Sequence, residues 1–131
     1  MATDVADKLL YRQLTYKIIG IFYKVHTALG CGFPEKIYQK AIETELKQEK
    51  IPYETEKPFK VFYAGKEVGS FRLDLIIDEK VIVEIKAVEY LAKIFKEQLI
   101  SQLKAAPYEI GLLVNFGATK LEYVRIMRSK K

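Results

Sequence analysis

The first third of the chain has apolar residues at helical spacing. From about Asp4 to Leu29 they recur in steps of three and four, at Leu14, Ile18, Ile21, Phe22, Val25 and Leu29. This spacing predicts one amphipathic helix, which Gly30 and Gly32 end. Pro34 suits the first turn of a second helix, which Pro52 stops. The apolar stripe of that helix is expected to comprise Ile37, Tyr38, Ala41, Ile42 and Leu46.

In the middle of the chain, residues suited to the two faces of a β-sheet alternate, as they do in β-strands. Aromatic and β-branched residues predict a strand from Tyr53 to Tyr63, and Ala64-Gly65-Lys66 predicts a turn into the next strand. One face of that next strand is expected to carry Phe71, Leu73, Leu75 and Ile77. The other would carry Arg72, Asp74 and Ile76. In the third strand, one face is expected to carry Val81, Val83 and Ile85, and the other face Ile82, Glu84 and Lys86.

The last third predicts one helix and two strands. The helix runs from about Glu89 to Ala105, and its buried stripe is expected to be Leu91, Ile94, Phe95, Leu99 and Leu103. A strand buried on both faces follows over Ile110–Asn115, and a short edge strand over Leu121–Met127. The order ααβββαββ predicts an α/β (α+β) fold with one mixed β-sheet flanked by helices. Without a visible repeat or linker, residues 1–131 are expected to form a single domain.

Composition and charge narrow the function classes. The chain has 131 residues, of which 50% are hydrophobic and 30% charged, as in an ordinary globular domain. The net charge of +5 favours anionic partners such as nucleic acid. Cys31 is the only cysteine, which excludes an intrachain disulfide and a Cys-based zinc site. Because Met1–Leu10 lacks a secretion pattern and the apolar runs are short, we expect a cytoplasmic protein without a membrane segment.

The chemistry is expected where the second and third strands meet. If Ile77 pairs with Val81 across a loop of residues 78–80, Asp74 lies opposite Glu84, with Cβ atoms about 5 Å apart. Arg72 would then lie opposite Lys86. Two half-buried carboxylates repel each other unless a cation compensates them, and Mg²⁺ prefers such oxygen ligands while keeping waters for a substrate phosphate. A structural ion network with Arg72 and Lys86 is the alternative that this spacing leaves open.

Two motifs carry a resemblance to known proteins. Asp74, followed ten residues later by Glu84-Ile85-Lys86, resembles the metal and lysine motif of the PD-(D/E)XK nuclease superfamily. The segment from Gly32 through Glu35 to Tyr38 resembles the pattern for which the GxxExxY proteins of that superfamily are named. Residues 69–72 resemble their G-x-x-R segment, and residues 111–117 with Arg125 resemble their C-terminal strand and turn. The resemblance implies a restriction-endonuclease-like fold and a metal-dependent nuclease acting on nucleic acid, with DNA as the favoured substrate.

The resemblance also implies roles for particular residues. Asp74, Glu84 and the carbonyl of Ile85 would bind Mg²⁺ or Mn²⁺, and Lys86 would act on the attacking water. Glu35 would complete the metal site from its helix, although a favourable interaction with the helix dipole explains it equally well. Gln98 fits a glutamine position of related nucleases. Gln102 departs from their pattern, because it occupies a position where they often have tyrosine; for both glutamines a partly exposed polar edge is the alternative.

Three further expectations complete the sequence-based interpretation. His26, beside Phe22 and Leu29, is expected to be packed or structurally hydrogen-bonded. The basic tail Arg128–Lys131 is expected to contact phosphates without reading sequence. Junction resolvases of similar size suggest a homodimer.

The alternative function is a nuclease-fold module that binds nucleic acid or protein with little or no catalysis, since fold alone does not decide function.

Overall fold

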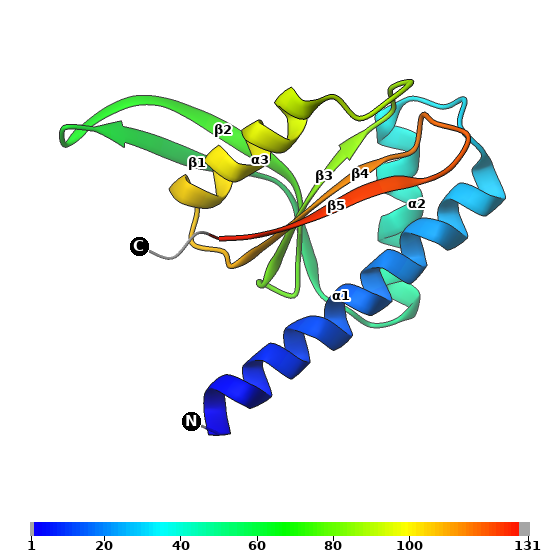
Figure 1. Cartoon of the computed structure of the whole chain (residues 1–131), viewed down its shortest axis with the longest axis horizontal. Coiled ribbons are helices and arrows are strands. Elements are labelled where there is room, and N and C mark those ends of the chain that lie inside the picture. Colours follow the sequence, from blue (N-terminus) through cyan, green and yellow to red (C-terminus); the bar gives the residue numbers. More distant parts are fainter. Residues whose placement is uncertain (1, 129–131) are drawn as a thin grey trace.

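The computed structural model describes residues 2–128, with side chains from residue 11 onward. The helices are α1 (Ala2–Leu29), α2 (Glu35–Gln48) and α3 (Lys93–Ala105). The strands are β1 (Tyr53–Tyr63), β2 (Lys66–Ile77), β3 (Val81–Lys86), β4 (Ile110–Asn115) and β5 (Glu122–Met127). Figure 1 shows these elements in the order that the sequence predicts.

In the described part of the chain the strands form one five-stranded sheet in the order β1-β2-β3-β4-β5. The β3–β4 pair is parallel and the other neighbouring pairs are antiparallel, so the predicted mixed sheet is confirmed. Parallel neighbours require a crossover connection, which α3 provides between β3 and β4.

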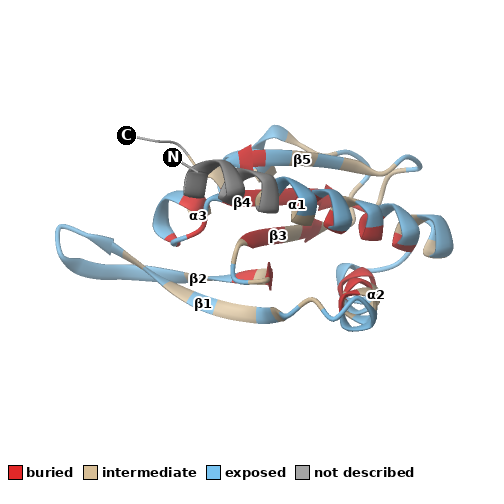
Figure 2. Cartoon of the chain, turned by 90° about the horizontal axis from the view of Figure 1, so that it is seen from below, coloured by how far each residue is buried: buried red, intermediate tan, exposed pale blue. Residues whose placement is uncertain are grey.

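The sheet separates two hydrophobic cores. On one face α1 and α2 pack through residues such as Phe22, Tyr38 and Ile42 against alternate residues of β3 and β4. On the other face α3 packs through Leu99 and Leu103. Figure 2 shows the buried residues concentrated where helices and strands meet. Burying apolar surface on both faces stabilises the central strands, and β4 is buried along its whole length.

Some predicted positions need correction. The third helix begins at Lys93 rather than at Glu89, because residues 87–92 form a loop after β3. Ile37 and Ile94 were expected in buried stripes, but their exposed fractions are 40% and 52%. Each apolar stripe is therefore narrower than the sequence suggests.

The simple alternation predicted for β2 is wrong. Leu73 packs in the core under α3 and Phe71 packs against it, whereas Leu75 and Ile77 belong to the core under α1 and α2. The same change occurs in β1, where Tyr53 packs against the core under α1 and α2 and Phe59 packs against the core under α3. The β1–β2 pairing omits the level of Glu56 and Asp74, and Glu56 has a left-handed backbone with φ of 54°. The β1–β2 hairpin therefore twists at the level of Glu56 and Asp74, so that residues before and after this level pack in different cores.

Beyond this level the β1–β2 hairpin projects from the body of the protein (Figure 1). We call residues 57–72 the arm. None of its residues is buried, in contrast to β4. The base of the arm is held by Phe59, whose ring lies 5.9 Å from that of Phe71 and 5.8 Å from that of Tyr108. The arm is thus anchored only at its base.

Replacing Gly117 by alanine is expected to destabilise the fold by about 2 kcal/mol, because a Cβ there would lie 2.3 Å from the backbone nitrogen of Val88. The loop after β3 would have to move away from β4. Gly20→Ala is the control: nothing lies within 4 Å of its added Cβ, and alanine favours a helix by up to about 1 kcal/mol. Denaturant unfolding of both variants measures the difference. Equal stability of the two would contradict this packing.

Candidate metal centre

The β2–β3 pairing confirms the predicted register. Ile77 pairs with Val81, Ile76 with Ile82, and Leu75 with Val83. The turn between the strands uses left-handed backbone at Asp78 and Glu79, and the Lys80 amide donates to the carbonyl of Ile77 at 3.0 Å. Past Leu75 the ladder stops, and Figure 1 shows β2 curving toward the arm while β3 runs the other way. Asp74 and Glu84 lie where the two strands begin to diverge.

The Asp74 and Glu84 side chains replace the ladder at this point. The Ile85 amide donates to Oδ2 of Asp74 at 3.0 Å, and the Asp74 amide donates to Oε1 of Glu84 at 3.3 Å. Each carboxylate thus reaches across to the other's strand, which brings the two acids together. The backbone satisfies one oxygen of each carboxylate, and the remaining oxygens are available to a ligand.

Burial and neighbouring negative charge raise the pKa values of both acids. Burial raises the pKa of Glu84 to about 8, and the charge of Asp74 adds to that effect. Burial likewise raises the pKa of Asp74, with a smaller contribution from the charge of Glu56. Two neighbouring acids with raised pKa values favour either a proton or a metal cation between them. The oxygen donors therefore fit a hard divalent cation.

Lys86 is a cation whose charge acts on both members of the acidic pair. It belongs to the same face of β3 as Glu84, its Nζ lies 4.7 Å from the centre of the Phe95 ring, and its charge lowers the pKa of both acids. The expected position of Arg72 opposite Lys86 is wrong, because the strands have already diverged there. Arg72 is exposed and donates from Nη1 to the carbonyl of Glu56 at 3.2 Å.

Glu35 approaches the pair without joining it. It is the first residue of α2, it is exposed, and its charge contributes to the raised pKa of Glu84. Within residues 2–128, however, no group of three or more His, Cys, Asp or Glu side chains is close enough to hold a metal ion. The side chains of Asp74 and Glu84 therefore make up the acidic donors that the described structure brings together.

Lys36 and Glu56 were missed by the sequence interpretation. Lys36 Nζ lies 2.9 Å from Oε2 of Glu56, which ties the first turn of α2 to β1 beside Asp74. Their spacing along the chain gives no signal of this contact.

Asn115 was also missed, although a polar residue at the end of a fully apolar strand is a signal. Its side chain is fully buried, accepts from the amides of Val88 and Gly117, and donates to the carbonyl of Val88 and to Glu122. These four hydrogen bonds fix the chain just after Lys86. Asn115 thereby positions the end of β3 that carries Glu84 and Lys86.

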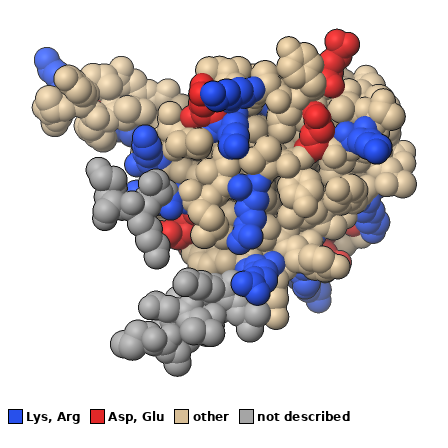
Figure 3. All heavy atoms as spheres, in the orientation of Figure 1, with Lys and Arg blue, Asp and Glu red and all other residues tan. Residues whose placement is uncertain are grey.

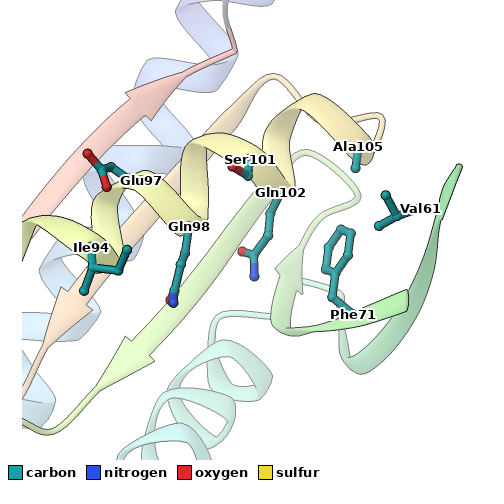
Figure 4. A pocket seen from close by; sticks show the side chains of 8 residues that line it. All are labelled: Val61, Phe71, Ile94, Glu97, Gln98, Ser101, Gln102 and Ala105. Carbon is teal, nitrogen blue, oxygen red and sulfur yellow. The ribbon is translucent and has the colours of Figure 1, made fainter. Parts of the chain in front are cut away.

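Gln98 and Gln102 line a cavity of about 530 Å³ between α3 and the arm. Figure 4 shows both side chains pointing from α3 into it, with Phe71 and Val61 on the opposite wall. Gln98 is exposed, whereas Oε1 of Gln102 is buried and has no hydrogen-bond partner among the described residues. Both glutamines therefore contribute to the wall of this cavity, whose lining includes neither Asp74 nor Glu84.

Two other expectations concern residues outside this centre. Nε2 of His26 lies 2.9 Å from the carbonyl oxygen of Ala118, in agreement with a structural role. In the predicted basic tail, Arg128 is half-buried and its amide donates to Glu109, while residues 129–131 lie outside the described residues. None of the described helices is long and apolar enough to cross a membrane.

The fold and the strand-borne acids with their lysine agree with the nuclease superfamily that the sequence resembles, and comparison with known proteins supports that superfamily. A family model described as the PD-(D/E)XK nuclease superfamily matches residues 12–126. The chain belongs to this superfamily. Its fold is also similar to the crystal structure of SSO0001, with a TM-score of 0.56 and 24% identity. That similarity covers 73% of this chain and 50% of the other, so the chain spans about half the length of SSO0001. No curated protein sequence matches the chain.

Replacing Asp74 by asparagine is expected to raise the stability of the metal-free protein by about 0.5 kcal/mol, because one of two neighbouring acids is removed. Asparagine keeps an oxygen that accepts from the Ile85 amide. Asp74→Ala is the matched variant: it leaves that amide unpaired and is expected to cost about 1–3 kcal/mol. Melting curves in chelator test both. Destabilisation by asparagine would instead place Asp74 in a structural ion pair.

Proposed function

We propose that this protein is a metal-dependent nuclease of the GxxExxY group that hydrolyses phosphodiester bonds in nucleic acid, with DNA as the favoured substrate. The observation that carries the proposal is the pairing of Asp74 and Glu84 where β2 and β3 diverge, with Lys86 on the same face. Superfamily membership supports the nuclease class. The net charge of +5 is compatible with a polyanionic substrate.

The chain offers a ligand set suited to Mg²⁺ or Mn²⁺. Asp74 and Glu84 would each give a carboxylate oxygen, and Ile85 its carbonyl oxygen. When bound there, the cation would supply a Lewis acid that polarises the phosphate and stabilises the leaving oxygen. Glu35 would assist from the N-terminus of α2, where the neighbouring Lys36 forms an exposed ion pair with Glu56 of β1.

The chain's own residues would perform the remaining work. Lys86 would hold the attacking water and offset the negative charge that develops on the phosphate oxygens. Packing over the Phe95 ring restricts its ammonium group to this side of the sheet. Gln98 would orient the substrate from the wall of the cavity. The basic tail would contact neighbouring phosphates.

One observation favours the alternative of a binding module with weak or absent catalysis. In the described part of the chain the acidic centre has no third acidic or histidine ligand within reach. A cation held by two carboxylates alone would bind less tightly than one held by three.

Metal titration followed by cleavage assays separates the two functions. Calorimetry of chelator-treated protein with Mg²⁺ and with Mn²⁺ is expected to give binding that Glu84→Gln abolishes and Glu109→Gln, an exposed control, leaves intact. Cleavage is then measured on single-stranded, duplex and branched DNA and on RNA. Nucleic-acid binding without cleavage of any of these would favour the binding module.

A further inference from the structure

The arm carries an excess of basic residues. Residues 57–72 contain Lys57, Lys60, Lys66 and Arg72 against one acidic residue, Glu67. The ion pairs of Lys57 with Glu54 at 3.3 Å and of Lys60 with Glu67 at 3.7 Å involve exposed side chains, so water and salt screen them. In Figure 3 the projecting end of the arm shows a basic side chain and no acidic one on the visible face. The arm therefore presents positive charge to an anionic partner.

The tip of the arm exposes large apolar side chains. The exposed fractions are 62% for Phe62, 75% for Tyr63 and 60% for Val68. The strand register shifts between Val61 and Phe62, just beyond the anchored base. An unsupported two-stranded ribbon is marginally stable in water, and exposed aromatic residues at its end offer flat surfaces on which bases stack.

The arm is continuous with the candidate metal centre. Arg72, the last residue of the arm, is two residues from Asp74 on β2. From Asp74 to Lys66 at the tip are eight residues, which span about 26 Å at about 3.3 Å per residue. This length equals about eight base steps of a duplex. A two-stranded ribbon also fits the width of the DNA major groove.

We propose that the arm binds nucleic acid on one side of the phosphodiester held at the Asp74–Glu84 centre. Lys60, Lys66 and Arg72 contact backbone phosphates, and Phe62 and Tyr63 stack on unpaired bases. This inference rests on the proposed function, because it places the substrate at that centre. It assigns to the arm a preference for nucleic acid that is branched or partly single-stranded about eight base steps from the cut.

Binding measured in chelator tests the charges without cleavage. The arm variant carries both Lys60→Gln and Lys66→Gln. It is compared with an α2 variant that carries Lys40→Gln and Lys47→Gln, which remove the charges of two exposed lysines. On a fluorescent 30-base-pair duplex, the arm variant is expected to lose about tenfold in affinity and to reduce the salt-dependence slope by about two. The α2 variant is expected to change neither. Equal losses in the two variants would overturn the proposal.

The aromatic tip has its own comparison. Phe62→Ser with Tyr63→Ser is expected to weaken binding about fivefold to a branched duplex, and little to a fully paired one. Tyr16→Ser, whose side chain is 81% exposed on α1, is the control and is expected to bind like the wild type. The same loss on both substrates would overturn the stacking role. Since no arm residue is buried, the variants are expected to retain the wild-type melting temperature.

The result distinguishes this inference from the proposed function. If the wild type binds DNA without cutting it and the arm variant still loses affinity, the proposed nuclease activity fails and the arm inference stands. If the wild type cuts DNA and both charge variants bind equally, the arm inference fails alone. A change from dimer to monomer in sedimentation of the arm variants, with an unchanged salt slope, would assign the arm to a second copy of the chain and overturn the inference.

Discussion

Lys86→Ala is expected to lower the rate of nucleic-acid cleavage at least 100-fold, about 3 kcal/mol of barrier, while changing the affinity for DNA little. The reason is that the charge of Lys86 acts on both acids, and in the proposed mechanism its ammonium would act on the water and on charge that develops only in the transition state. Single-turnover cleavage at saturating DNA measures the barrier, and fluorescence anisotropy measures the affinity.

Two comparisons make this prediction specific. Lys47→Ala, in the last turn of α2, removes the same charge from an exposed site and is expected to cleave at the wild-type rate. Removing the arm charges is expected to weaken binding instead, with a nearly normal rate once the DNA is saturating. Equal cleavage by wild type and Lys86→Ala would show that any activity comes from another site, and the binding module would become the better account.

Glu84→Gln is expected to remove most of the pH dependence of stability between pH 5 and pH 8 in the metal-free protein. Glu84 has a pKa of about 8 in the folded protein, against an ordinary value of 4.5 in the unfolded chain. As the pH rises through this window the unfolded chain releases the proton while the folded protein keeps it. Unfolding thus becomes easier, by about 3 kcal/mol across the window, and the loss is complete above pH 8.

The measurement is chemical denaturation at pH 5 and pH 8 in chelator. The raised pKa of Asp74 acts in the same direction, so the variant is expected to retain a small slope. Glu109→Gln is the exposed control and is expected to keep the wild-type slope. Added Mg²⁺ is expected to flatten the wild-type curve and to release protons, because the cation replaces the proton on the acids. An unchanged slope in Glu84→Gln would contradict the burial of this charge.

The periodicity of the chain was enough to predict the element order and most boundaries. β1 and β4 have the predicted limits, because turn residues and aromatic or apolar runs mark them locally. The start of α3 was predicted four residues too early. Leu91 fits the helical spacing, but the loop before α3 is held by Asn115 through Val88, a contact between residues 27 apart that no local pattern records.

The sequence by itself determined the register that brings Asp74 to Glu84, because a three-residue loop and the parity of the strands leave one pairing that puts both acids together. Only the tertiary structure decided what surrounds them. The twist of the hairpin at Glu56 moves Phe71 and Leu73 to the opposite core and directs Arg72 away from Lys86. Such a twist depends on which core each half of the hairpin can reach, and alternation along one strand carries no information about that.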